Sequence, residues 1–95
     1  MNSIVKRIGI SAFSGCSSLK QIEIPSSVTS IGNYAFNECS SLLQISIPSS
    51  VTELKDGTFY GCSSLTNIEI PSVTFIGNYV FEGCSSLLEI PYLSS

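Results

Sequence analysis

The sequence contains no histidine, and this absence narrows the chemistry that the chain can carry out. Nucleophilic catalysis by serine or cysteine usually depends on a histidine base, so neither Ser–His nor Cys–His chemistry is expected. A glycine-rich phosphate loop followed by lysine is also missing. We therefore expect a non-enzymatic protein with no catalytic residues and no cofactor.

Basic residues are scarce as well. The chain has 4 Lys and Arg residues against 7 Asp and Glu residues, which gives a formal net charge of −3. Three of the basic residues, Lys6, Arg7 and Lys20, lie close together near the beginning of the sequence. Proteins that bind phosphate backbones need a basic surface, so nucleic acid is not an expected partner.

Long apolar runs are absent. The longest runs are only a few residues, far short of the roughly 20 that cross a bilayer, and the first residues show no apolar signal-peptide core. No Asn-x-Ser/Thr glycosylation site occurs. From the chain itself we expect no membrane insertion and a cytoplasmic location.

What the sequence does contain is one phrase, Cys-Ser-Ser-Leu, written four times. Its cysteines recur at intervals of 23, 23 and 22 residues, and the last interval is shorter because "IPSSVT" becomes "IPSVT" with one serine lost. Such a period is typical of a repeat architecture. We interpret residues 1–95 as a single repeat domain, with a partial repeat at 1–15, full repeats at 16–38, 39–61 and 62–83, and a partial repeat at 84–95.

Within a repeat, the local pattern predicts one strand, a turn and a second extended segment. Ile22 and Ile24 alternate with Gln21 and Glu23, which predicts a strand of about five residues with both isoleucines on one face. Pro25 ends it, because proline offers no N–H to a ladder. The following Val-Thr segment favours a shorter extended stretch, and the return to the next cysteine favours 3₁₀-like turns over a helix.

One repeat cannot bury its apolar side alone, so we expect the repeats to stack as coils. Equivalent positions would then form columns about 4.8 Å apart, the spacing of neighbouring strands. The predicted columns are Phe13, Phe36, Phe59 and Phe81, then Leu19, Leu42, Leu65 and Leu87, and finally Ile22, Ile45, Ile68 and Ile90. No capping segment is visible in the sequence, so we expect uncapped ends.

The phrase L-x-x-I-x-I-P with a 23-residue period, followed by V-T-x-I-G-x-x-A-F-x-G-C, resembles the BspA-like leucine-rich repeats. These repeats occur in surface proteins of anaerobic bacteria and in protozoan families. The resemblance implies a mainly β fold, a right-handed leucine-rich-repeat β-solenoid with a parallel sheet on its concave face and short strands or 3₁₀ turns elsewhere. It also implies protein binding or self-association, and a cell-surface location in contrast to the cytoplasmic one above.

The resemblance further implies that the concave sheet is the binding surface for a protein partner. On this chain that surface maps to the polar strand positions Gln21, Glu23, Gln44, Ser46, Asn67, Glu69 and Glu89. These positions vary between repeats while the apolar columns barely change, as expected of an interaction module. Three departures from the pattern occur. Lys55 and Asp56 replace Gly-Asn, Thr58 stands where Ala35 stands in the repeat before, and Pro91 interrupts the last strand.

The alternative function is a structural self-assembling or cell-surface adhesion element that uses the uncapped ends. A two-fold homodimer is favoured, because two-fold dimers are the commonest oligomers, and its contact is predicted at Leu87, Leu88, Ile90, Tyr92 and Leu93. A head-to-tail arrangement is the other possibility. It would bring the basic start of the chain against the acidic later repeats with Glu69, Glu82 and Glu89.

The four cysteines, Cys16, Cys39, Cys62 and Cys84, stand one repeat apart. Zinc needs ligands that converge on one point, whereas these would form a column, so no metal site is expected. Adjacent coils are close enough for a disulfide, but parallel Cβ directions fit its dihedral poorly. We expect reduced, buried thiols that fill space behind the leucines and phenylalanines.

Overall fold

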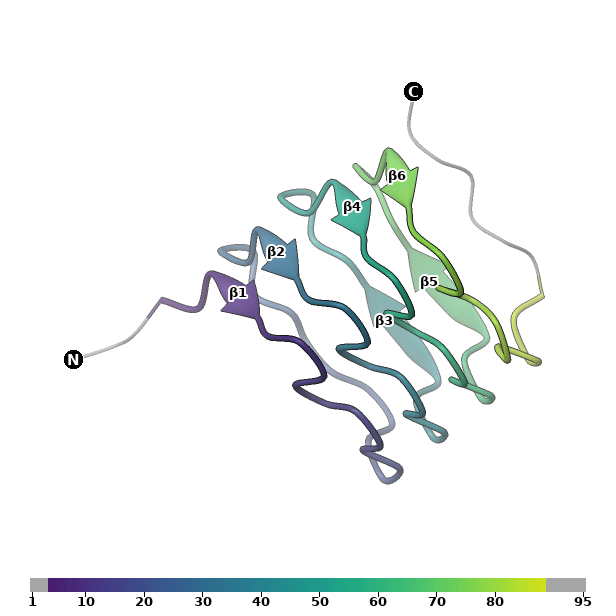
Figure 1. The fold of residues 1–95 in the computed structure, drawn as a ribbon. Coiled ribbons are helices and arrows are strands. Elements are labelled where there is room, and N and C mark those ends of the chain that lie inside the picture. The colour runs from purple at the N-terminus through teal and green to yellow at the C-terminus, as the bar shows by residue number, and fades with distance from the viewer. Residues whose placement is uncertain (1–3, 89–95) are drawn as a thin grey trace.

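The computed structural model describes residues 4–88, which form four stacked coils (Figure 1). Each of the first three coils ends at its proline, so that the coils comprise residues 4–25, 26–48, 49–71 and 72–88. The expected mainly β solenoid is confirmed, and equivalent segments of successive coils lie side by side. Within residues 4–88, no helix has the length and apolar character that a membrane crossing requires.

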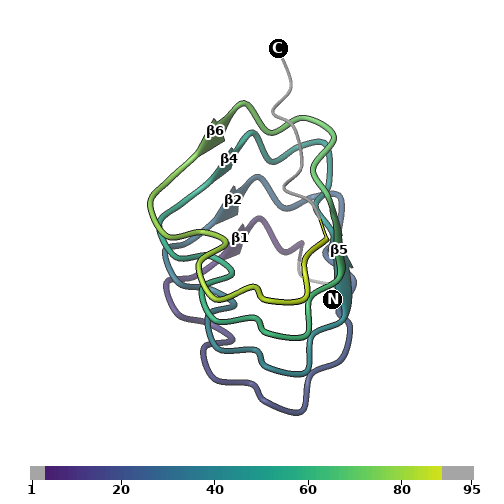
Figure 2. The same cartoon turned by 90° about the vertical axis from the view of Figure 1, so that its right-hand side faces the viewer.

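Short strands lie on two sides of the coils and pair in parallel (Figure 2). One side carries β1 (Arg7–Ile8), β2 (Ser30–Ile31), β4 (Glu53–Leu54) and β6 (Phe75–Ile76), where β1 pairs with β2 and β4 with β6. The other side carries β3 (Gln44–Ser46), β5 (Asn67–Glu69) and a single bridge from Gln21 to Gln44. Both predicted extended segments of the repeat are therefore present.

The strands are shorter than the predicted length of about five residues. β3 and β5 have 3 residues each, and the first coil contributes only the bridge at Gln21. Two features limit them. The turn that closes with Leu42 N–H donating to Cys39 O at 3.1 Å lies just before β3, and Pro48, which has no N–H, follows soon after it.

Turns carry much of the backbone hydrogen bonding between coils. Phe13 N–H donates to Ala35 O at 2.8 Å, and Phe36 N–H donates to Thr58 O at 2.9 Å. In this turn ladder the amide of the earlier coil always donates to a carbonyl of the later coil. The turn itself is closed by bonds over three residues, such as Ala35 N–H to Gly32 O at 3.2 Å, as the sequence predicted.

Each strand on the β3 and β5 side leads into a proline turn. Val28 N–H donates to Pro25 O and Val51 N–H to Pro48 O, both at 3.0 Å. In the last coil, which lacks one serine, Val73 N–H donates instead to Ile70 O at 3.4 Å. Serine hydroxyls also tie these turns to the coil before, because Ser27 donates to Val5 O and Ser50 to Val28 O, both at 2.5 Å.

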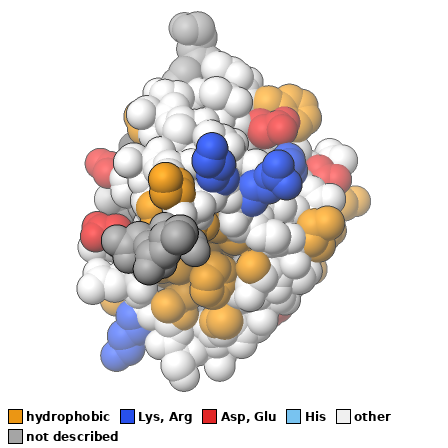
Figure 3. All heavy atoms as spheres, turned by 90° about the vertical axis from the view of Figure 1, so that its left-hand side faces the viewer, with side chains coloured by type: hydrophobic (Ala, Val, Ile, Leu, Met, Phe, Trp, Pro, Cys, Tyr) orange, Lys and Arg blue, Asp and Glu red, His pale blue; other side chains and the backbone are white. Residues whose placement is uncertain are grey.

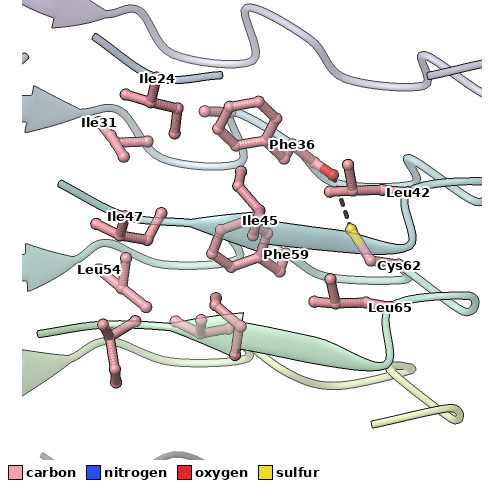
Figure 4. Packing of buried hydrophobic residues seen from close by; sticks show 14 of the residues in the cluster. Ile24, Ile31, Phe36, Leu42, Ile45, Ile47, Leu54, Phe59, Cys62 and Leu65 are labelled. Atoms are coloured by element: carbon pink, nitrogen blue, oxygen red, sulfur yellow. Dashed lines mark hydrogen bonds between the residues drawn. The ribbon is translucent and has the colours of Figure 1, made fainter. Parts of the chain in front are cut away.

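The core is a set of side-chain columns, with the phenylalanines at its centre (Figure 4). The ring centroids of Phe13 and Phe36 are 5.3 Å apart, those of Phe36 and Phe59 5.7 Å, and those of Phe59 and Phe81 6.2 Å, with planes within 9° of parallel. Phe36 and Phe59 are fully buried, whereas Phe13 and Phe81 at the two ends are half-buried. The predicted columns are confirmed, although Ile90 lies outside the described residues.

Two residues of every coil have a left-handed backbone. One set is Ser11, Tyr34, Gly57 and Tyr79, and the other is Gly15, Glu38, Gly61 and Gly83. Glycine at position 57, with φ of 63°, has a second role because a Cβ there would overlap the ring of Tyr34. The third repeat has Lys-Asp-Gly where the second and fourth coils have Gly-Asn-Tyr. The glycine of this sequence leaves the space that the Tyr34 ring of the preceding coil occupies.

Replacing Phe59 by Ala is expected to lower the free energy of unfolding by about 3–5 kcal/mol. The ring is stacked on both sides, so the cavity cannot collapse, and this loss is a large share of the roughly 5–15 kcal/mol of a typical domain. Urea denaturation followed by circular dichroism measures the change. Phe75→Ala, at a phenylalanine with an exposed fraction of 56%, is the matched control and should change stability little. Equal stability of Phe59→Ala and wild type would contradict the stacked core.

Replacing Gly57 by Ala is expected to destabilise the protein by about 1–3 kcal/mol through overpacking against the Tyr34 ring. The left-handed backbone conformation of this position costs an alanine about 1–2 kcal/mol of stability in addition, the usual penalty for an L-residue. Combining it with Tyr34→Ser, which removes the ring, should recover the steric part and leave the backbone part. A double-mutant cycle from denaturation curves separates the two, and strict additivity would argue against the ring contact.

Candidate functional site

The polar strand positions predicted to bind a partner lie together on one face of the molecule. We call the six that the structure describes the sheet face; they are Gln21, Glu23, Gln44, Ser46, Asn67 and Glu69. All six side chains are exposed, while Ile45 and Ile68 between them are buried. Strand alternation therefore sorts the residues as the sequence predicted. Glu89, the seventh predicted position, lies outside the described residues.

A shallow groove of about 340 Å³ runs across the sheet face. It is lined by all six residues, together with Ile22 and Ile45. The parallel register sets its layout, because Gln21 pairs with Gln44, Gln44 with Asn67, and Ser46 with Glu69. One row of the groove therefore consists of side-chain amides, and the row beside it consists of two glutamates and a serine.

The groove is acidic and rich in hydrogen-bonding groups. Glu23 and Glu69 are its charged residues, and no Lys or Arg is among its lining residues. The Ser46 hydroxyl donates to Glu69 Oε1 at 3.1 Å, which links the second and third coils. Carboxylates accept hydrogen bonds from cationic donors, and amides both donate and accept. The arrangement is suited to binding an extended polar segment.

The residues predicted for two-fold self-association are only partly described. Leu87 is half-buried, and Leu88 has an exposed fraction of 90%. Ile90, Tyr92 and Leu93 lie outside the described residues. Pairing through this end therefore stays a prediction.

The four cysteines are free thiols in a column, as the sequence predicted. Cys39, Cys62 and Cys84 are buried, and Cys16 in the first coil is half-buried. Within residues 4–88, no three or more His, Cys, Asp or Glu side chains gather as metal ligands would.

The buried thiols do more than fill space, and sequence reasoning missed this. Each donates a hydrogen bond to a phenylalanine carbonyl of the preceding coil, as the dashed line in Figure 4 shows for one of them. The Sγ–O distances are 3.1 Å from Cys39 to Phe13, 3.1 Å from Cys62 to Phe36 and 3.2 Å from Cys84 to Phe59. A signal was present, because a cysteine follows each of these phenylalanines by 25 or 26 residues. The thiol is therefore a second link between coils.

A family model supports the architecture described above. The model of the BspA type leucine rich repeat region matches residues 1–95 in 6 copies. Among curated protein sequences, none matches this chain closely enough for comparison.

Solved bacterial structures share the fold. A leucine rich repeat protein of T. pallidum is 38% identical over 88% of this chain and 40% of its own, with a TM-score of 0.84. One from Bacteroides ovatus is 41% identical over 85% of this chain and 21% of its own, with a TM-score of 0.82. A leucine rich cell surface protein from Faecalibacterium prausnitzii is 32% identical over 100% of this chain and 31% of its own, also with a TM-score of 0.82. This chain spans less than half the length of each.

Two of the three buried thiols, Cys62 and Cys84, predict a loss of stability in mild alkali. The neighbouring Cys39 sulfur and burial raise the pKa of the Cys62 thiol, and burial raises that of Cys84. A folded pKa above the unfolded one contributes stability that is complete below about pH 8.5 and is lost as the pH rises further. We expect the free energy of unfolding to fall by up to about 1.4 kcal/mol per pH unit for each such thiol, measured by urea denaturation between about pH 9 and 10.

Cys62→Ser provides the control for this pH dependence, because a serine hydroxyl does not ionise in that range. The variant should lose part of the slope even though it is less stable overall. An identical slope in wild type and Cys62→Ser would show that the thiol does not cause the effect.

Proposed function

Because the chain belongs to the BspA-type leucine-rich repeat family, we propose that it is a non-enzymatic interaction module that binds a protein partner through the sheet face. Repeats of this family generally serve as interaction or surface modules. The observation that carries the proposal is the gathering of six variable polar side chains around one groove of about 340 Å³, directly above a uniform apolar core.

The chemistry of the groove favours a basic, extended partner segment. Glu23 and Glu69 would accept hydrogen bonds from lysine or arginine side chains, and complementary charge would speed the encounter. The amides of Gln21, Gln44 and Asn67 would bond to the partner backbone. Leu43, adjacent to the amide row, has an exposed fraction of 49% and offers an apolar contact.

A cell-surface adhesion element is the second candidate. It is supported by the similarity to the leucine rich cell surface protein of Faecalibacterium prausnitzii, which extends over the whole of this chain but only 31% of that protein. In this case the same sheet face would meet a partner outside the cell. The two candidates differ in the partner's location and share the binding surface.

Charge reversal on the sheet face tests the proposal. A peptide library displayed on phage is selected against the wild-type protein, and the selected peptides are expected to be enriched in lysine and arginine. Binding of these peptides is then measured by calorimetry for Glu23→Lys/Glu69→Lys. We expect affinity to fall at least tenfold, because favourable charge pairs become repulsive.

Glu53→Lys/Glu82→Lys is the matched control, since it makes the same charge change at two exposed glutamates outside the groove. It should retain the affinity of the wild type to within a few-fold. Equal losses in both double variants would mean that net charge, and not the sheet face, governs binding. Selected peptides without basic residues would contradict the proposed partner chemistry.

A further inference from the structure

The two glutamates of the groove stand at a fixed spacing. Glu23, Ser46 and Glu69 form one row, the acidic row, because Ser46 pairs in register with Glu69 and Glu23 precedes Ser46 by one repeat. Neighbouring strands are about 4.8 Å apart, so the glutamates are attached two coils, or about 9.6 Å, apart along the stack. In Figure 3, which views the stack from the end opposite to Figure 2, acidic side chains project on the left, where the sheet face lies.

Both carboxylates of the acidic row are available to a partner. The Ser46 hydroxyl lies between them and donates to Glu69 Oε1 at 3.1 Å, which restrains that side chain. Within residues 4–88, the Glu23 carboxylate has no hydrogen-bond or ion-pair partner, and no Lys or Arg lines the groove. A partner that engages both glutamates must therefore carry two cationic groups on one side, at about the spacing of two coils.

The second row of the groove offers hydrogen-bond donors at the spacing of single coils. We call Gln21, Gln44 and Asn67 the amide row; they pair in register and so stand about 4.8 Å apart. Each side-chain amide has two N–H donors, and none of the three side chains has a hydrogen-bond partner within residues 4–88. The amide row can therefore bind backbone carbonyls of a partner, provided that those carbonyls are not already bonded.

The backbone beneath the groove is already paired between coils. Leu43 N–H donates to Lys20 O and Thr66 N–H donates to Leu43 O, both at 2.9 Å, and β3 pairs with β5 over 3 residues. A partner on this face therefore cannot join the sheet as a further strand, the arrangement in which main-chain bonds supply the affinity. Binding has to use the side chains of the two rows and the free backbone of the partner.

Among regular conformations, polyproline II matches the spacing of the acidic row best. It has three residues per turn and rises about 3.1 Å per residue, so every third side chain lies on the same side at about 9.3 Å. A β-strand repeats one side at about 6.7 Å. An α-helix returns to one side after seven residues at about 10.5 Å, but its carbonyls are bonded within the helix. The polyproline II backbone has no internal hydrogen bonds, so its carbonyls are open to the amide row.

We propose that the groove binds a polyproline II segment whose lysine or arginine residues are three positions apart, lying across the strands and along the stack. Two successive basic side chains would meet Glu23 and Glu69, and the amide row would donate to the carbonyls beside them. This rests on the proposed function, and it adds the conformation and the residue spacing of the partner.

A neighbouring charge determines which side of the segment faces which row. Lys20 is exposed and directly precedes Gln21, so a basic residue opposite the amide row would approach a like charge. The basic side of the segment is therefore placed on the acidic row. Its proline rings then lie toward the amide row and Leu43, whose exposed fraction of 49% offers an apolar contact.

Three capped peptides of equal composition and charge test the spacing. PPKPPKPP has its lysines three residues apart, whereas PPPKPKPP and PPKPPPKP have them two and four apart. Proline holds all three in polyproline II, where only the first peptide presents both lysines on one side. NMR titration that follows the side-chain amide signals of Gln21, Gln44 and Asn67 gives each dissociation constant. We expect PPKPPKPP to bind about threefold or more tightly than either of the others, because they lose one charge pair.

Glu23→Ser/Ser46→Glu is the matched protein variant. It keeps the composition and net charge of the chain but brings the two glutamates from two coils apart to one. Both exchanged positions are exposed, so the fold should be retained, and circular dichroism checks this. The variant should bind the three peptides with affinities that no longer favour PPKPPKPP. Glu69→Ser/Ser46→Glu makes the same change at the other glutamate and serves if the first variant is unfolded.

The outcomes separate this inference from the proposed function. Equal binding of the three peptides by wild type would overturn the polyproline II spacing and leave a basic partner of the sheet face standing. Binding of phage-selected basic peptides without binding of any proline peptide would do the same. A preference for PPKPPKPP that persists in both exchange variants would place the peptide outside the groove. If neither the proline peptides nor any basic peptide binds, the proposed function falls together with the inference.

Discussion

Contact between successive coils is the interaction on which the whole structure depends. A single coil has turn amides without acceptors and both faces of its phenylalanine ring exposed. Neighbouring coils of the same layout supply the acceptors and cover the ring. Phe36 and Phe59 are fully buried because coils lie on both sides of them. The constraint is strict in register, since the rings stay within 9° of parallel while turn amides, buried thiols and the hydroxyls of Ser27 and Ser50 meet carbonyls of a neighbouring coil.

Much of this fold could be predicted, because the repeat period of the sequence equals the length of one coil. The 23-residue interval, the alternation around Ile22 and the prolines specified coils, columns and a parallel sheet. Strand length could not be predicted in the same way, since it depends on where the preceding turn closes at Leu42. The left-handed residues were also missed. Tyr34 and Glu38 adopt φ near 60° although their side chains do not favour it, so tertiary stacking decides their backbone.

For the candidate site, too, one part could be predicted from the sequence and another could not. Strand alternation was enough to place Gln21, Gln44 and Asn67 in one row, because the face of a strand follows from position alone. The thiol bonds, such as Cys62 to the Phe36 carbonyl, were not foreseen. They join residues in different coils. Each bond requires a backbone carbonyl that points toward the thiol, and the sequence does not specify the direction of a carbonyl.

The shortened proline turn before Val73 shows where this architecture can change its length. Losing one serine moves the turn's acceptor from a proline carbonyl to Ile70 O, yet the bond still spans three residues, and β4 and β6 stay in register on Leu54 and Ile76. What is given up is one serine of the turn, because Ser72 alone stands between Pro71 and Val73 where Ser49 and Ser50 stand in the coil before. Insertions and deletions at this corner are therefore absorbed locally, so repeats of unequal length can be joined into one array without disturbing the columns on either side.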